Sequence, residues 1–492
     1  SFPIFHRCHS EERQRRRIFP RNGIPLLVEN GKAGKKEILP LHFVQGQDDS
    51  NLDSDKKADK MCYAIPGKVE KIEGKIVTVD YFGERRKAHN ELAMLSTGDY
   101  IYAQGGYVIS KISFEEAQSI LSVWKEEFFE LQETDLRISR LDIEKKGIDK
   151  KLIEILDKAT KNLPLNRDEL LYLINIKEQP QLELLFKAAN FLRHKYHKNS
   201  CCLHGIIEIS NYCKRSCYYC GISGLNHNLK RYRMNKKEIL KAAFEAINEY
   251  GFKSLVLQSG EDGGYKIEEL AQIIRQIKEE APALIFISFG EIGLDNLETL
   301  YQAGARGLLM RFETSNPRIY QKLHPGQALV TRLEHLKKAY EIGYLILTGG
   351  LIGLPEQTKE DILNDLYLAK ELYAEMFSFG PFLAHPDTPL AKNNLPKEEE
   401  VMKVLAIARI IDSEKAKILV TTALETLSST AREKGLLAGA NSVMLNVTPL
   451  EYRQLYSIYP NRAHCLENIE FQIGQTISLL RSLGRAPTDL SI

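Results

Sequence analysis

The segment that most constrains this chain is Cys213-Lys-Arg-Ser-Cys217-Tyr-Tyr-Cys220, which places three cysteines on one short loop. Three thiolates at this spacing can hold three corners of a cubane iron–sulfur cluster. The fourth iron is then left without a protein ligand, and an open position on a metal is where chemistry can occur. The apolar run at residues 205–209 is typical of a strand that leads into the loop.

Zinc binding, or three buried structural thiols, is the alternative interpretation of these cysteines. A structural zinc site needs a fourth Cys or His at short range, and the nearby His204 and His227 lie at unusual spacings for one. Closely spaced cysteines among the eight of this chain favour metal ligands over disulfides and indicate a reducing compartment. We therefore predict a 4Fe-4S cluster and a cytoplasmic location.

Charge and hydropathy exclude two classes of partner. The net charge is only +2, which argues against binding nucleic acid through a global field. No apolar run approaches the roughly 20 residues of a membrane span. The 492 residues suffice for two or three domains.

The cysteine spacing, with the aromatic Tyr219 just before the last cysteine, resembles the signature of the radical S-adenosylmethionine (SAM) enzymes. The resemblance implies that the open iron binds the amino and carboxylate groups of SAM. It also implies that an electron from the cluster cleaves SAM to a 5′-deoxyadenosyl radical. The reaction that follows is not set by the motif.

Strand and helix patterns alternate after the cysteine loop, and eight strands close most naturally into an α/β (β/α)8 barrel. An open doubly wound sheet is the second possibility, although no glycine-rich phosphate-binding motif follows the first strand. The predicted strands are 205–209, 254–259, 284–289, 307–311, 344–349, 376–380, 418–422 and 442–445.

Polar residues stand at the end of every predicted strand, where barrels of this kind form their active sites. SAM carries a carboxylate that favours a guanidinium, and an ammonium and ribose that favour a carboxylate or carbonyl. Arg311, Glu313 and Arg332 meet these needs. For Arg332, a solvated charge on a helix is the alternative.

Motifs over about residues 150–490 resemble HydE, the family of radical SAM maturases of the di-iron hydrogenases. The resemblance implies SAM contacts by Arg311, Glu313 and Arg332. Tyr219 and Glu261 are further candidates for binding SAM. The matching segments are 211–221, 228–234, 257–262, 311–314, 353–355, 380–382, 385–390, 421–423 and 452–456.

The HydE resemblance also implies a substrate, the small organometallic precursor Fe(CO)2(CN)-cysteine, which becomes the di-iron subcluster. The adenosyl radical is expected to attack sulfur, and the catalytic residues remain unknown. The expected partners are other hydrogenase maturation proteins and a low-potential electron donor. Candidates to line a substrate cavity inside the barrel are Thr421, Thr422, Met444 and Tyr456.

A different pattern starts at Met61, where short alternating strands predict a small all-β, OB-like barrel over residues 61–130. Ser113 and Glu116 form a capping-box pattern at the start of its C-terminal helix, predicted to end near 131. The opening residues 61–69 resemble the HypC/HupF hydrogenase maturation chaperones. This implies that Cys62 is a possible iron-carrier ligand, whereas the barrel histidine usual in that family is Gln104 here.

The remaining boundaries follow from composition. Residues 1–60 have a basic cluster, a charged polar run and poor periodicity, and we predict a disordered extension. One interpretation is that it lies upstream of the true start, Met61, so that Cys62 becomes N-terminal. Residues 131–150 are predicted to be a linker, and residues 151–492 the radical SAM barrel.

Two further hypotheses stay open. One is a related radical SAM enzyme of the methylornithine synthase or biotin synthase type, although biotin synthases need further barrel cysteines that strands two to eight lack. The other is a non-catalytic iron–sulfur scaffold for metallocentre assembly. Some HydE proteins carry a second cysteine cluster near the C-terminus, but only Cys465 stands there, so we do not expect one.

Overall fold

The structure, a computed structural model, describes residues 65–92, 94–142 and 147–487. All of them belong to one compact unit. The predictions about residues 1–60, Met61 and Cys62 lie outside the described residues. None of the helices in the described part of the chain has the length and hydropathy that a membrane span requires.

A small barrel of five strands comes first, as predicted, and closes in the order β1-β2-β3-β5-β4. Valine and isoleucine side chains such as Val69, Val79 and Ile101 fill its interior. The strand β3 was not predicted, because only Ala88 of its six residues is buried. The strands are β1 (Gly67–Glu73), β2 (Ile76–Tyr81), β3 (Glu84–His89), β4 (Tyr100–Gln104) and β5 (Tyr107–Ile112).

The helix α2 (Phe114–Ile138) follows this barrel and starts where the sequence predicts. The Ser113 side chain accepts a hydrogen bond from the Glu116 backbone N–H at 3.1 Å, which caps the first turn. Trp124 and Phe128 pack into the apolar core of the small barrel. The helix continues beyond its predicted end and takes up part of the segment expected to be a linker.

Three helices lead to the second barrel: α3 (Lys150–Thr160), α4 (Arg167–Asn175) and α5 (Gln179–His197). Asn166 and Glu169 form a complete capping box at the start of α4.

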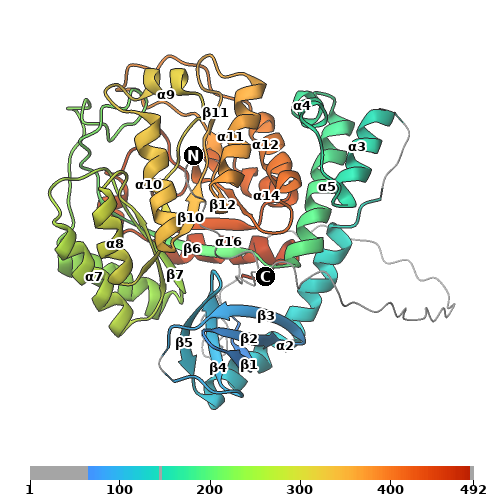
Figure 1. Ribbon diagram of the computed structural model, residues 1–492, viewed down its shortest axis with the longest axis vertical. Coiled ribbons are helices and arrows are strands. Elements are labelled where there is room, and N and C mark those ends of the chain that lie inside the picture. The colour runs from blue at the N-terminus through green and yellow to red at the C-terminus, as the bar shows by residue number, and fades with distance from the viewer. Residues whose placement is uncertain (1–64, 93, 143–146, 488–492) are drawn as a thin grey trace, which may run out of the picture. The chain divides into compact units, whose positions relative to one another are not determined.

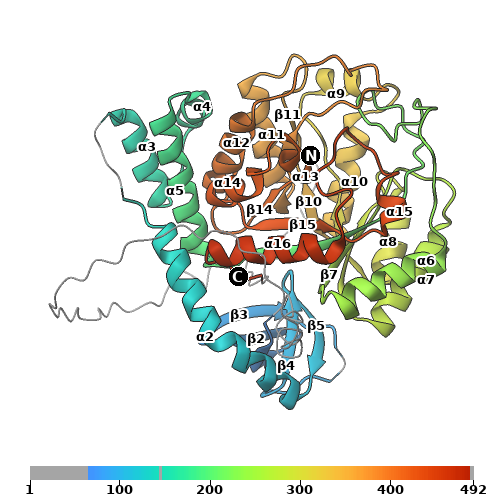
Figure 2. The ribbon, with the colours of Figure 1, turned by 180° about the vertical axis from the view of Figure 1, so that it is seen from behind.

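Eight parallel strands then form a closed barrel, which confirms the predicted (β/α)8 architecture over the open sheet. Each strand pairs in parallel with both of its neighbours, and β15 closes the ring on β6. The register shifts between β6 and β7, between β8 and β9, and between β10 and β12. Figures 1 and 2 show the helices around the outside of these strands. The strands are β6 (Cys202–Ser210), β7 (Ser254–Ser259), β8 (Leu284–Ser288), β9 (Ala305–Leu309), β10 (Leu345–Thr348), β12 (Ala374–Phe377), β14 (Lys417–Val420) and β15 (Ser442–Asn446).

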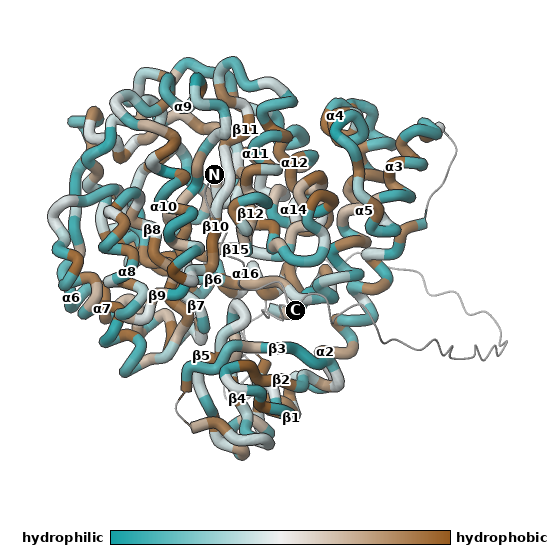
Figure 3. Tube along the Cα trace, viewed as in Figure 1, coloured by the Kyte–Doolittle hydropathy of each residue, from teal (hydrophilic) through white to brown (hydrophobic). Residues whose placement is uncertain are grey.

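Hydrophobic and hydrophilic residues alternate along the helices of this barrel (Figure 3), as expected of helices with one face on a sheet. A two-stranded sheet of β11 (Leu351–Ile352) and β13 (Gly380–Pro381) extends two of the strand ends. The helices are α6 (Lys236–Phe244), the π-helix η2 (Glu245–Glu249), α7 (Ile267–Glu280), α8 (Leu294–Gln302), α9 (Pro317–Leu323), α10 (Leu329–Ile342), α11 (Lys359–Glu371), α12 (Glu398–Ile411), α13 (Thr422–Leu427), α14 (Ala431–Leu437), α15 (Leu450–Arg453) and α16 (Ile469–Ser482).

The two barrels contact each other through residues of the early part of the large-barrel strands. Tyr102 and Ile109 of the small barrel share one apolar cluster with Val256 and Phe286. Polar contacts flank it, including an ion pair of 2.9 Å between Glu91 and Arg306. The predicted site residues lie at the carboxyl ends of these strands. That end of the large barrel is opposite to the end that contacts the small barrel.

Candidate active site at the carboxyl ends of the strands

The cysteine loop follows β6 directly and is held in place by its backbone. The N–H of Lys214 donates to the Glu261 carbonyl oxygen at 3.0 Å, and the N–H of Gly221 donates to the Ile458 carbonyl oxygen at 2.9 Å. A Cβ at Gly221 would lie 2.0 Å from the Ser457 carbonyl oxygen, so only glycine allows this close approach. Segments from β7 and from after β15 thus fix the loop.

The three thiols of the loop are close enough to affect one another. Burial raises the pKa of Cys213, and burial together with the neighbouring Cys213 raises the pKa of Cys217 to about 12. Burial and both other thiols raise the pKa of Cys220 as well. Thiolates in such a place need positive charge to offset their burial, and bound iron supplies it.

The arrangement of these thiols suits a cubane better than a single ion. Across residues 65–487, apart from the gaps at 93 and 143–146, no three His, Cys, Asp or Glu side chains are gathered tightly enough to hold one metal ion. A cubane cluster does not require the three thiolates to meet at one ion, because each thiolate binds its own iron. The residues therefore fit a 4Fe-4S cluster.

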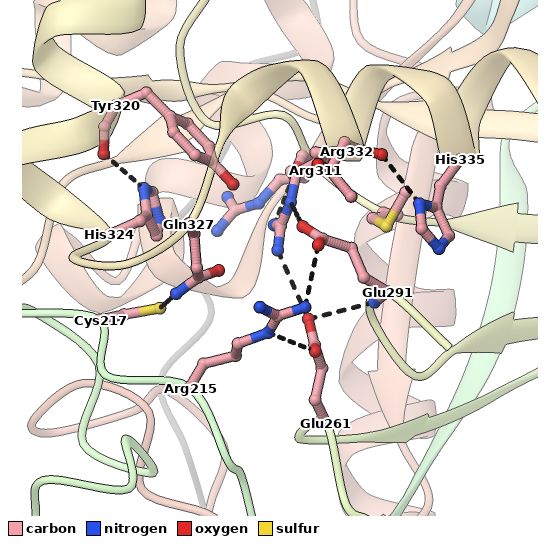
Figure 4. A network of polar contacts seen from close by, with 12 residues as sticks. Arg215, Cys217, Glu261, Glu291, Arg311, Tyr320, His324, Gln327, Arg332 and His335 are labelled. Atoms are coloured by element: carbon pink, nitrogen blue, oxygen red, sulfur yellow. Dashed lines mark hydrogen bonds and ion pairs between the residues drawn. The ribbon is translucent and has the colours of Figure 1, made fainter. Parts of the chain in front are cut away.

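Beside the cysteine loop, two arginines alternate with two buried carboxylates (Figure 4). Arg215, within the loop itself, ion-pairs with Glu261 and donates to Glu291 at 2.9 Å. Arg332 of α10 donates to Glu291 at 2.9 Å and lies 3.6 Å from Glu261. A Cβ at Gly290 would lie 2.4 Å from Glu261 Cγ, so glycine is needed for the carboxylate to enter the network.

Glu313 lies just after β9 in a conformation that few non-glycine residues adopt. Its φ is +69°, and such left-handed backbone costs about 1–3 kcal/mol and is concentrated at functional sites. Its N–H donates to the Gly349 carbonyl oxygen at 3.1 Å, and its own carbonyl oxygen accepts from Leu351 at 2.9 Å. These bonds to the strand-end segment 349–351 hold the strained backbone.

The Glu313 carboxylate is buried and incompletely satisfied. Its Oε2 atom is 3.4 Å from Arg311 Nε but makes no hydrogen bond to the described residues. Burial raises the pKa of Glu313 although Arg311 and Arg332 oppose the rise. An unsatisfied buried oxygen beside a partly exposed arginine is a ready acceptor for a ligand's donor group.

Tyr219, which precedes the last cysteine, donates to a neutral histidine. Burial lowers the pKa of His324 to about 3. Its Nδ1 is 3.0 Å from the Tyr320 carbonyl oxygen, so Nδ1 carries the proton. Nε2 is therefore the acceptor for the Tyr219 hydroxyl at 3.1 Å. This bond orients Tyr219 next to the cysteines.

The predicted cavity residues occupy different environments. Tyr456 is buried, and its hydroxyl accepts a hydrogen bond from Gln258 at 3.2 Å. Thr421 caps the N-terminus of α13, and Thr422 is the first residue of that helix. Met444 belongs to the apolar cluster that contacts the small barrel.

Sequence reasoning missed several charged and polar partners of these residues. Arg215 and Glu291 were not identified, although both lie in segments singled out as the cysteine loop and a polar strand end. The buried ion pair of Glu208 and Arg462 next to Tyr456 was also missed. Glu208 lies within an otherwise apolar predicted strand. A charged residue in such a strand was the one sequence signal that could have indicated a buried ion pair.

Comparison with protein families gives two matches. Residues 207–369 match the radical SAM superfamily, and residues 61–124 match the HupF/HypC family.

Comparison with individual proteins agrees with these family matches. The chain is 38% identical over 334 residues to the FeFe hydrogenase maturase subunit HydE of Thermotoga maritima, which covers 68% of this chain and 95% of that protein. It is 28% identical over 333 residues to the 3-methylornithine synthase of Methanosarcina acetivorans, covering 67% and 93%. A crystal structure of methylornithine synthase (PylB) aligns with a TM-score of 0.59 at 25% identity, covering 68% of this chain and 97% of that one.

Proposed function

We propose, from the premise that this chain belongs to the HydE family of radical SAM enzymes, that it processes Fe(CO)2(CN)-cysteine during assembly of the di-iron hydrogenase cofactor. The single observation that carries this proposal is the match, at 38% identity, over 95% of the length of a HydE maturase. Other maturation proteins and a low-potential electron donor are the partners that this function requires, in the cytoplasm.

The cluster would be held by Cys213, Cys217 and Cys220. When bound, a 4Fe-4S cluster supplies an electron for cleaving the SAM sulfonium bond and an open iron that binds SAM. Arg215 balances the charge at this loop by pairing with Glu261 and Glu291.

For the SAM site, we propose the charged groups next to the cysteines. Arg311 is free to pair with the SAM carboxylate, because its only ion pair in the described chain is the 3.4 Å contact with Glu313. Glu313 Oε2 would accept from the SAM ammonium or ribose. Glu261 and Arg332 are already paired with protein partners, so their role would be to hold the site together, with Tyr219 beside the cluster.

Replacing Arg311 or Glu313 with alanine should weaken SAM binding while the cluster stays in place. A hydrogen bond to a charged group contributes about 1.5–3 kcal/mol, so SAM affinity should fall roughly tenfold or more. Calorimetric titration of SAM into protein with an oxidised cluster measures this without turnover. Arg318→Ala is the matched control, because its side chain is 79% exposed and its one ion pair within the described residues is with Glu356. SAM affinity that is equal in all three variants would exclude this site.

The substrate would lie inside the large barrel, next to Thr421, Thr422 and Tyr456. The ion pair of Glu208 and Arg462 supplies buried charge there. Met444 lies in the apolar layer toward the other end of the strands and would form the floor. The HypC-like segment, with Cys62 as its iron ligand, would carry chemically similar iron, and we propose it as the donor module for the barrel.

Turnover by the anaerobically reconstituted full-length protein tests the function. We expect 5′-deoxyadenosine and methionine to form with a low-potential reductant, and Fe(CO)2(CN)-cysteine to be consumed. Rearrangement of lysine to methylornithine would favour the second enzyme class instead, and an intact cluster without SAM cleavage would favour a scaffold.

A further inference from the structure

A tight turn between α9 and α10, at residues 324–327, faces the cysteine loop. The Gln327 N–H donates to the His324 carbonyl oxygen at 3.1 Å, and Gly326 has a φ of +73°. Pro325 followed by Gly326 is the sequence preferred at the centre of a type II turn. The turn therefore fixes the positions of its two outer residues, His324 and Gln327.

Both outer residues of the turn contact the cysteine loop. His324 accepts from Tyr219, and the preceding Leu323 carbonyl oxygen accepts from the Tyr218 N–H at 3.0 Å. At the other end of the turn, Gln327 Nε2 lies 3.8 Å from the sulfur of Cys217 (Figure 4). The turn thus reaches a cluster ligand from a segment 110 residues further along the chain.

The side-chain amide of Gln327 directs its N–H, and not its carbonyl oxygen, toward the Cys217 sulfur. Its Oε1 atom is buried and has no hydrogen-bond partner among the described residues, so no other group selects this orientation. A carbonyl oxygen facing a thiolate would be repelled, whereas an N–H stabilises it.

We propose that Gln327 is a positioning residue that donates its amide N–H to the Cys217 thiolate and so raises the reduction potential of the cluster. Reduction adds one electron from a low-potential donor, and a hydrogen bond to sulfur favours the more negative, reduced form. This rests on the proposed function only in requiring that Cys213, Cys217 and Cys220 hold the cluster.

Redox titration of the reconstituted full-length protein, followed by electron paramagnetic resonance, tests the proposal. Gln327→Leu removes the donor at similar size, and Gln327→Glu keeps the shape but places a carboxylate near the sulfur. Both should lower the midpoint potential, with the larger shift for glutamate. We expect the one-electron equilibrium constant to change by up to about tenfold for leucine, which corresponds to about 59 mV. Gln321→Leu, an exposed glutamine of α9, should leave the potential unchanged.

The remaining outcomes contradict the proposal. Unchanged potentials with full iron content in both Gln327 variants would show that the contact does not tune the cluster. Loss of the cluster from both variants would show a structural contact only. If the unmodified protein binds no four-iron cluster, the proposed function fails first, and this proposal fails with it.

Discussion

Replacing Cys217 with alanine should abolish SAM cleavage. Cys217 is the middle of the three loop cysteines in the sequence, and its removal leaves two ligands for a cluster that needs three. We expect no 5′-deoxyadenosine above background and a large loss of bound iron after anaerobic reconstitution. Product analysis by mass spectrometry and iron counting on the same samples measure both effects.

Cys465→Ala provides the matched control for this loss. Cys465 is a free cysteine far along the chain from the loop, and we expect its variant to keep the cluster and the activity. A Cys217 variant with normal iron content and normal SAM cleavage would refute the assignment of the cluster to this loop.

The large barrel could be predicted because its signals are local. Each strand from β6 to β15 is a short apolar run, and the eight runs alternate with amphipathic helices. The missed strand β3 shows the limit, because Arg85, Arg86 and Lys87 hide a strand whose only buried side chain is Ala88. Its pairing with β2 depends on a neighbour, which the pattern of β3 alone does not contain.

The predicted end of one strand was wrong because threonine can either end a strand or cap a helix. Thr421 and Thr422 were assigned to the end of a strand. The Thr421 side chain instead accepts from the Leu424 N–H and caps α13. Threonine is compatible with both positions, and the short β14 ends at Val420 because the helix starts directly after it.

The predicted site residues could be found from motif resemblance, but their partners could not. Arg215 and Glu291 are 76 residues apart in sequence, and Gln327 and Cys217 are 110 apart. Nothing local distinguishes Gln327 from exposed glutamines such as Gln321. Only the closure of the barrel brings the ends of β7, β8 and the turn after α9 next to the cysteine loop.

A buried ion network joins α2 to the large barrel. Asp135 of α2 accepts from two Arg193 nitrogens at 2.7 Å each and lies 3.1 Å from Arg485. All three side chains are fully buried. Burial would raise the pKa of Asp135, but Arg193 and Arg485 outweigh it and lower the pKa to about 2. The carboxylate is therefore charged in the folded protein and balances two buried cations.

Replacing Asp135 with asparagine should lower the free energy of unfolding by about 3–5 kcal/mol, because two guanidinium groups lose their buried counter-charge. Fluorescence of Trp124, the single tryptophan and a buried residue of α2, follows urea unfolding of this region. Asp142→Asn is the control, since Asp142 is 76% exposed and its ion pair contributes at most about 1 kcal/mol. The folded pKa of Asp135 lies below the ordinary 3.8, so the stabilisation is complete above pH 3.8 and is lost as the pH falls toward 2. The difference in the free energy of unfolding between Asp135→Asn and the unmodified protein should narrow over that interval.

An equal loss of unfolding free energy in Asp135→Asn and Asp142→Asn at neutral pH would contradict a stabilising role for the network.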